Sequence, residues 1–301
     1  MRSPIVIAAY ATLSLTLGGQ WIAAKLGVTA VPALELSAMR FVIATAVLLA
    51  ACAATRTALP LHRWRSIGAA AMCGAVGFNT LAFLGISITP ASDSALIIPT
   101  IIPLATALFA TLIHERLGGR KIAGFAIVSV GAALVIVGGQ GGGGEASALR
   151  LRGDLMEVGA AAAWGANLTI AAIVLRRESV LGYTTLMVTI GAVLLVPLGA
   201  LGDGYRDLGS WSTDTWIAAG FLGVCSTALA FVLFFWAVRR FGASLAAMVA
   251  YLTPVTRLVL AFFMLAERPL TLQLVGGVVI VIGVRIAARR AAMSIARPAA
   301  A

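Results

Sequence analysis

Charged residues are scarce in this sequence. Asp, Glu, Lys and Arg make up 11% of its 301 residues, whereas a soluble domain carries about 25%. Three long stretches, 4–24, 67–88 and 270–284, contain none of these four residues. A chain with so little charge and with 61% apolar residues does not match the composition of a soluble globular domain, so that class is excluded.

Cysteine and catalytic motifs are also sparse. The three cysteines, Cys52, Cys73 and Cys225, lie in apolar stretches, where a small buried thiol is the ordinary role and a disulfide or a metal site is not indicated. The sequence has no HExxH motif, no GxSxG motif and no pair of intramembrane aspartates. We therefore expect neither an enzyme nor a bound cofactor or metal. The chain also encodes no nucleotide-binding domain through which ATP could drive it.

Long apolar segments are what the sequence has instead. A helix rises about 1.5 Å per residue, so about 20 apolar residues cross a hydrocarbon core roughly 30 Å thick. Backbone groups in lipid must pair within their own segment or in a closed barrel, and these runs are too long and too uniformly apolar for barrel strands. We predict an all-α polytopic membrane protein with ten transmembrane helices, at 4–24, 32–53, 67–88, 92–113, 122–138, 154–175, 182–202, 215–238, 243–265 and 270–288.

Lys and Arg are distributed unevenly between the two sides of these spans. With the N-terminus in the cytoplasm, fifteen of the 22 Lys and Arg residues fall on the cytoplasmic side and five on the other side, while Arg40 and Arg257 lie within spans. Cytoplasmic loops carry this excess in membrane proteins. We therefore predict a multi-pass protein of the bacterial inner (plasma) membrane with both termini cytoplasmic. The net charge of +11 reflects this asymmetry, and no basic soluble domain is left to bind nucleic acid.

The chain repeats itself at an offset of 152 residues. The offset aligns Glu115-Arg116 with Glu267-Arg268, Gly124 with Gly276, and Gly131 with Gly283. Each unit has five helices, an odd number, so the second unit must enter the membrane from the opposite side, as in many secondary transporters. We predict two inverted five-helix repeats, with the first at 1–140, a Gly-rich outer linker at 141–153, the second repeat at 154–290 and a cytoplasmic tail at 291–301.

Three segments, at 35–50, 97–139 and 251–284, carry a resemblance to a known family. Arg-Phe in the second helix, a proline thirteen residues before Glu-Arg, and the spaced glycines that follow form the family's pattern, from which Pro103 departs because it lies twelve residues before Glu115. The sequence resembles the drug/metabolite transporter superfamily, in its ten-helix, two-repeat (EamA-type) branch, and is most similar to bacterial exporters of amino acids, aromatic ones included. The resemblance implies a secondary transporter of small metabolites. The extra proline Pro99 and the charged Arg257 depart from the family pattern and concern the expected cavity.

Polar, aromatic and proline residues deep in the spans are candidates for lining a transport path. Proline frees the carbonyl four residues earlier, and a water-filled cavity can satisfy such a carbonyl. Aromatic rings and amides suit the side chain, ammonium and carboxylate of an amino acid. The candidate substrate-binding residues are Tyr10, Trp21, Asn79, Pro99, Pro103, Trp164, Asn167, Tyr251, Pro254 and Arg257. Hydrogen bonding between helices is the alternative role for each polar side chain. The roles of Glu35 and Arg40, in substrate attraction or in structural pairing, are left open.

These features favour a secondary transporter over an intramembrane enzyme or a channel. We expect it to export small amphipathic metabolites, with amino acids including aromatic ones as the leading substrates, by alternating access through a central cavity. A multidrug or other metabolite exporter of the same superfamily is the alternative. The expected partners are the small-molecule substrate and the lipid bilayer, and the protein is expected to act as a monomer. No acidic residue lies at mid-span, so we expect facilitated diffusion with weak proton coupling.

The topology can be tested with reporter fusions at each loop and at both ends of the chain. Because Lys and Arg concentrate in the loops assigned to the cytoplasm, reporters at both termini should be active only as cytoplasmic markers. Reporters in successive loops should alternate between the two sides. An externally labelled C-terminus would contradict both the orientation and the even number of spans.

Overall fold

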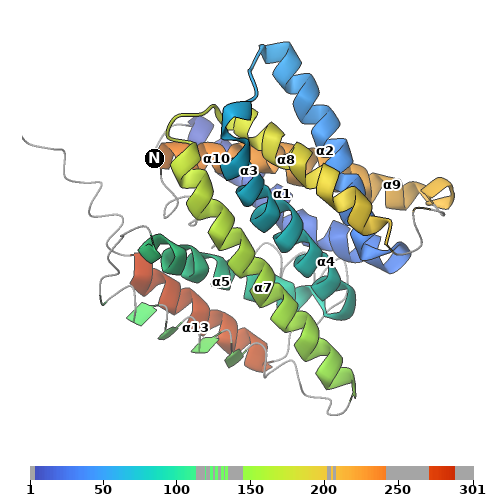
Figure 1. Cartoon of the computed structure of the whole chain (residues 1–301). Helices are drawn as coiled ribbons and strands as arrows, with labels where there is room; N and C mark the ends of the chain where they lie inside the picture. Colours follow the sequence, from blue (N-terminus) through green and yellow to red (C-terminus); the bar gives the residue numbers. More distant parts are fainter. Residues whose placement is uncertain are drawn as a thin grey trace, which may run out of the picture.

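The computed structural model describes residues 4–112, 145–201, 208–241 and 271–288, together with Tyr205 and scattered positions between 119 and 134. Every regular element in these ranges is helical (Figure 1). Five helices of this part of the chain are long and apolar enough to cross a membrane. The prediction of a mostly helical, multi-pass membrane protein is therefore confirmed at this level.

The helices follow the apolar segments of the sequence closely. The first half contains α1 (Pro4–Ala30), α2 (Ala33–Thr55), a continuous rod made of η1 (Leu61–Arg63), α3 (Trp64–Ala71), η2 (Met72–Gly77) and α4 (Phe78–Ile88), and then α5 (Ala91–Leu112). The second half contains α7 (Glu145–Val174), α8 (Val180–Gly199), η3 (Leu208–Ser210), a second rod made of α9 (Thr213–Gly220), η4 (Phe221–Leu229) and α10 (Ala230–Phe241), and finally α13 (Thr271–Ala288). The helix predicted at 243–265 lies outside the described residues, and only scattered helical positions represent the one at 122–138.

The largest departure from the predicted boundaries in the described part of the chain is at the start of α7. The helix α7 begins at Glu145 and not at residue 154, so the part of the predicted linker from Glu145 onward is helical. The segment EASALRLRG is too polar to extend an apolar run, but Glu, Ala, Leu and Arg are all strong helix formers. Arg150 therefore belongs to α7, on the same helix as the residues that follow it.

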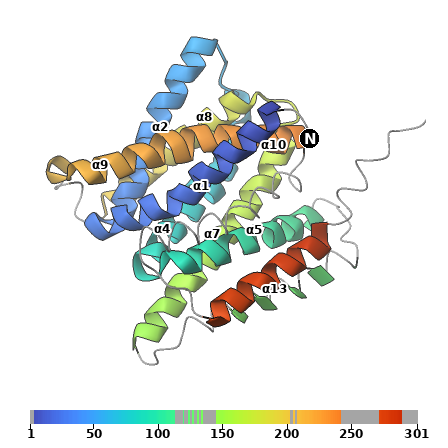
Figure 2. The same cartoon turned by 180° about the vertical axis from the view of Figure 1, so that it is seen from behind.

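The two halves of the chain pack against each other through reciprocal helix contacts. The second helices of the halves, α2 and α8, lie against each other. The first helix of each half packs on the long rod of the other half: α1 contacts α9, η4 and α10, while α7 contacts α3, η2 and α4. Figures 1 and 2 show α1 running alongside α9–α10, and α13 beside α5. This crossed packing places α2, α4, α7 and η4 around the interior of the bundle.

Both long rods are interrupted by a π-helical turn at matching places. The rods Leu61–Ile88 and Thr213–Arg240 are 28 residues each, and the second begins 152 residues after the first. Their π segments are η2, within the first rod, and η4, within the second. A π turn takes one more residue than an α turn and is often found at functional sites. In an apolar rod such a turn also interrupts the regular series of α-helical hydrogen bonds. Its carbonyl groups therefore need other donors.

Side chains supply those donors from within each rod. The Nδ2 of Asn79 donates to the carbonyl oxygens of Gly74 at 3.0 Å and Ala75 at 2.8 Å. In the second rod the Oγ1 of Thr227 donates to the carbonyl oxygen of Leu222 at 2.8 Å. Each rod thus has one such bond to a carbonyl five residues earlier, from Asn79 to Gly74 and from Thr227 to Leu222. Asn79 therefore stabilises the π turn of the rod to which it belongs.

Replacing Asn79 with Leu, which keeps the volume of the side chain, should destabilise the first rod. The π-turn carbonyls lose two donors, which should lower the free energy of unfolding by about 1–3 kcal/mol. The midpoint of thermal unfolding of the purified protein in detergent measures the loss. Thr80→Val is the matched control, because the neighbouring Thr80 hydroxyl is buried without a hydrogen-bond partner among the described residues. Equal midpoints for the two variants would show that the Asn79 bonds do not hold the turn.

Candidate functional site

Arg40 lies in the interior of the bundle with none of its surface exposed. It comes from α2, and its Nε donates to the Oγ1 of Thr227 on η4 at 2.9 Å. Its guanidinium carbon lies 5.1 Å from the ring centroid of Phe83 and 5.5 Å from that of Phe41. These cation–π contacts offset part of the cost of burying the charge, by about 1–2 kcal/mol when water is excluded. Arg40 thus links α2, α4 and the π turn of the second rod.

The remaining donors of Arg40 make it suited to an anion. Its Nη1 and Nη2 atoms are buried and have no hydrogen-bond partner in the described part of the chain. A charged side chain in this environment costs several kcal/mol unless it is paired. A carboxylate is the natural partner, since it can accept two parallel bonds from the edge of a guanidinium. The interior of the bundle therefore offers a carboxylate-binding group, on a residue whose role the sequence left open.

Glu35, the other charged residue of α2, has different surroundings. Its side chain is buried and its Oε1 has no hydrogen-bond partner among the described residues. It lines a cavity of about 310 Å³ between the start of α2 and the start of α9, with Trp211 and Ser212 on the other wall. Burial raises the pKa of the nearby Tyr205 phenol, and the charge of Glu35 adds to the effect. The described contacts thus do not show the structural pairing of Glu35 with Arg40 that the sequence allowed.

Aromatic rings pack next to Arg40. Trp164 of α7 is 6% exposed, and its ring centroid lies 4.9 Å from that of Phe78 and 5.1 Å from that of Phe231. The rings of Phe234 and Phe235 follow at 6.0 and 6.3 Å. Because Phe231 also contacts Phe41, this aromatic cluster is continuous with the rings around Arg40. An apolar aromatic surface beside a cation is a suitable environment for an amphipathic acid.

The two candidate amides meet at the π turn of the first rod. Asn167 is completely buried and accepts a hydrogen bond from the hydroxyl of Tyr183 at 3.4 Å. Its Cγ lies so close to Gly74 that a Cβ there would be only 2.5 Å away. Asn79 donates to the carbonyl oxygen of the same glycine. In this conformation both amides therefore bind protein groups around Gly74.

The other candidates from the sequence are distributed as follows. Pro99 and Pro103 lie in α5, which packs against α7. Tyr10 and Trp21 belong to α1, but their side chains are outside the described part of the structure. Tyr251, Pro254 and Arg257 lie wholly outside the described residues. The structure therefore brings Trp164, Asn79 and Asn167 together at the junction of α7 with the first rod.

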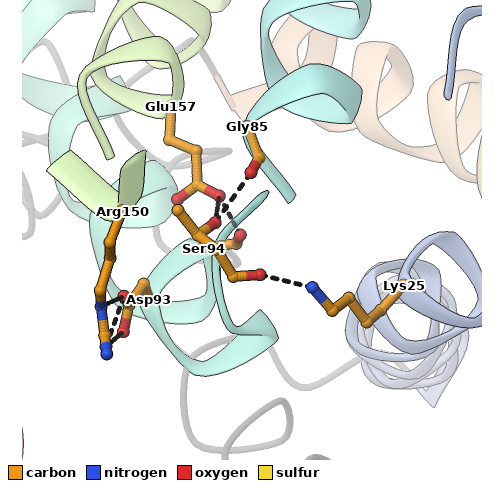
Figure 3. A network of polar contacts seen from close by, with 7 residues as sticks. Lys25, Gly85, Asp93, Ser94, Arg150 and Glu157 are labelled. Atoms are coloured by element: carbon orange, nitrogen blue, oxygen red, sulfur yellow. Dashed lines mark hydrogen bonds and ion pairs between the residues drawn. The ribbon is translucent and has the colours of Figure 1, made fainter. Parts of the chain in front are cut away.

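A second polar cluster, which the sequence analysis missed, lies where α4 turns into α5, here called the α4–α5 end (Figure 3). Glu157 of α7 accepts hydrogen bonds on Oε1 from the hydroxyls of Ser94 and Thr89, the latter at 3.1 Å. Arg150 binds both oxygens of Asp93, at 2.8 Å from Nε and 2.8 Å from Nη2. The interactions tie α7 to the α4–α5 turn.

Lys25 extends this cluster to α1. Its Nζ donates to the carbonyl oxygens of Ile86 at 2.8 Å and Thr89 at 2.6 Å. Three helical segments, α1, the α4–α5 turn and α7, are thus joined by polar contacts at one end of the bundle. The signal in the sequence is the spacing of Arg150, Asp154 and Glu157, at i, i+4 and i+7, which puts them on one helix face. Hydropathy places the start of this span at residue 154, so the two acids fall at its edge and Arg150 falls outside it.

This cluster also changes an inference from the sequence. Weak proton coupling was expected because no acid lies at mid-span. The structure has fully buried carboxylates on α7, in a helix that is apolar enough to span a membrane. The absence of an acid at mid-span therefore does not exclude proton binding elsewhere in the bundle.

Comparison with known proteins gives two matches to one family model. The model of the EamA-like transporter family matches residues 4–137 and again residues 151–289. A solved structure described only as a crystal structure of protein aligns with 96% of this chain and 98% of its own, with a TM-score of 0.67 at 21% sequence identity. That likeness concerns the fold alone.

Several relatives are named as transporters. A probable terminal-alkyne amino-acid exporter of Streptantibioticus cattleyicolor is 30% identical over 232 residues, which cover 76% of this chain and 75% of the relative. An uncharacterized transporter of Archaeoglobus fulgidus is 24% identical over 280 residues, covering 90% of this chain and 94% of the relative. An uncharacterized transporter of Bacillus subtilis is 26% identical over 214 residues, covering 70% and 68%. The matches extend across both halves of the chain.

Proposed function

Because the chain belongs to the EamA-like transporter family, we propose that it exports small amphipathic metabolites with a carboxylate, amino acids foremost and aromatic ones among them. The observation that carries the substrate class is Arg40, a buried guanidinium whose Nη atoms have no hydrogen-bond partner among the described residues, beside an aromatic cluster. The guanidinium would bind the carboxylate, and the rings around Trp164 would bind the apolar side chain. The relative named as an amino-acid exporter supports the same class.

We propose that ten helices cross the membrane as two inverted repeats, with both termini in the cytoplasm of a bacterial cell. The double match to the family model supports the repeat, and so do the two rods of equal length that each carry a π turn. The reciprocal packing of α1 and α7 on the opposite rods fits a pseudo-two-fold axis that passes where α2 meets α8. Such an axis in the plane of the membrane is the basis of alternating access in many transporters.

The π turns are the proposed bending points for alternating access. Each lies beside the interior site: Asn79 and Asn167 meet at Gly74 in η2, and Arg40 is bound to Thr227 in η4. Binding of a carboxylate would change the hydrogen bonds of the Arg40 guanidinium, which already donates to Thr227 in the π turn η4. Substrate binding and rod geometry would thereby be coupled, which is what a ligand needs in order to shift a conformational equilibrium.

A route into the site is proposed from the end opposite the α4–α5 end. There Val180, Trp236, Arg239 and Arg240 line a hollow of about 500 Å³. Its two arginines would attract carboxylates and its tryptophan would contact an apolar side chain. In the proposed topology this end faces the cytoplasm, from which an exporter takes its substrate. Tyr10, Trp21, Pro99, Pro103, Tyr251, Pro254 and Arg257 stay proposed lining residues.

Efflux from liposomes that contain only this protein tests the proposal. Phenylalanine should leave the liposomes down its gradient much faster than from protein-free controls. Phenethylamine, which has the same ring without a carboxylate, should leave at least tenfold more slowly through the protein than phenylalanine, because it cannot pair with Arg40. Arg40→Gln should lower phenylalanine efflux at least tenfold, a loss of about 1.4 kcal/mol or more, with folded yield measured alongside.

Arg65→Gln is the control, since Arg65 is exposed near the start of α3. It should leave phenylalanine efflux unchanged. Equal transport of phenylalanine and phenethylamine would overturn carboxylate recognition and favour a multidrug exporter. Undiminished efflux by folded Arg40→Gln protein would remove Arg40 from the substrate site.

A further inference from the structure

Two glycines allow α4 and α7 to approach very closely at the α4–α5 end. A Cβ added at Gly153 of α7 would lie 2.2 Å from the Cγ2 of Thr89 and 3.1 Å from the carbonyl oxygen of Gly85. A Cβ added at Gly85 would lie 2.9 Å from the Cγ of Glu157. Small residues at a helix crossing bring the backbones together. Here the crossing presses the Glu157 side chain into the interface, against the α4–α5 turn.

Two carboxylates of α7 are enclosed at this crossing. Asp154 and Glu157 have no exposed surface. Within the described part of the chain, both carboxylate oxygens of Asp154 and the Oε2 of Glu157 have no hydrogen-bond partner. The Oε1 of Glu157 accepts from Ser94 and Thr89. Three of the four carboxylate oxygens are therefore buried without a donor, next to hydroxyls of the α4–α5 turn.

The cations near this pair are engaged with other groups. From α7 itself comes Arg150, one turn before Asp154, and its guanidinium binds both carboxylate oxygens of Asp93 of α5. From α1 comes Lys25, which donates to backbone carbonyls (Figure 3). The segment that forms α4 contains no titratable residue. The helices α3 and α10 also pack on α7. Their cations, Arg65, Arg239 and Arg240, lie at the end of the two long rods that is opposite the α4–α5 end.

An ionised carboxylate without donors is costly to bury, and two of them one helical turn apart also repel each other. A proton taken up from water removes the charge and turns an acceptor-only group into one that can also donate. We propose that Asp154 and Glu157 form a proton-binding site, and that its occupancy keeps the α4–α5 turn closed against α7. When the helices separate, water hydrates the carboxylates and the proton returns to the solution as they ionise.

The way in which external pH acts on the transporter follows from the proposed topology, and this part of the proposal rests on that topology. In that topology the α4–α5 end faces the outside of the cell, so external protons reach the site when this end is open. External acid would then favour closure after the substrate has left and would return the transporter to the state that opens inward. The pair has no counterpart in the sequence of the first repeat: an offset of 152 places Arg2 opposite Asp154 and Ile5 opposite Glu157. Only one of the two ends would respond to protons in this way.

Infrared spectroscopy of the purified protein tests proton binding without a substrate or a known orientation. The wild-type protein at neutral pH should have a C=O band from a protonated carboxyl group that resists exchange with solvent. The band should weaken in Asp154→Asn and in Glu157→Gln, and it should be lost in the double variant. Asp214→Asn is the matched control, because Asp214 is an exposed acid in the first turn of α9, and it should leave the band unchanged.

Proteoliposomes test the effect on gating. Phenylalanine efflux by the wild type should change with the pH of the solution bathing the α4–α5 end. Efflux by the double variant Asp154→Asn, Glu157→Gln, in which both side chains are neutral at every pH, should not. Absence of the band in folded wild-type protein, or its persistence in the double variant, would overturn the proton site. A band with the expected behaviour but a pH response unchanged in the double variant would overturn the role of the proton site in closure. If phenylalanine is not transported at all, the infrared result still decides whether the site binds a proton, so the two proposals fail separately.

Discussion

Inside a lipid bilayer every polar group must find its partner within the protein or in a water-filled cavity, and this constraint governs the described structure. Each of its two long rods contains a π turn, and each π turn is stabilised by a side chain of its own rod, Asn79 in one and Thr227 in the other. Thr227 in turn accepts a hydrogen bond from Arg40. The same constraint makes the exceptions informative, because a buried polar group without a partner marks a place where a ligand or a proton would be stabilised.

The interior site and the α4–α5 end are two of these places in the described part of the bundle, and they differ in charge. At the interior site a guanidinium has spare donors beside an aromatic cluster, which suits an amphipathic anion. At the α4–α5 end two carboxylates have spare acceptors beside hydroxyls, which suits a proton. The first lies against a π turn and the second against a tight helix crossing, so each is connected to an element that can change shape. A transporter needs such a connection, because a ligand shifts a conformational equilibrium only through contacts that differ between the two states.

Much of the fold could be predicted from the sequence, because the length and uniformity of an apolar run fix a spanning helix almost independently of its neighbours. The helices α2, α5 and α8 begin and end close to the predicted positions. The start of α7 was missed because hydropathy does not recognise a polar segment made of helix formers. The partners of Arg40, the π turns and the enclosure of Glu157 depend on contacts between distant helices, such as the crossing at Gly85 and Gly153. Trp164 and Asn167, which the sequence predicts to bind substrate, are buried in the bundle, and their contact with substrate stays a prediction.

The central claim is that the two ends of the bundle open alternately around the interior site. Distances between spin labels in the reconstituted protein measure this directly, with one pair at the exposed positions Thr29 and Leu149 near the α4–α5 end and another at the exposed positions Thr55 and Arg176 near the opposite end. When phenylalanine is added, one distance should lengthen in the same fraction of molecules in which the other shortens. Two distances that lengthen together, or that ignore a substrate which the protein transports, would contradict alternating access.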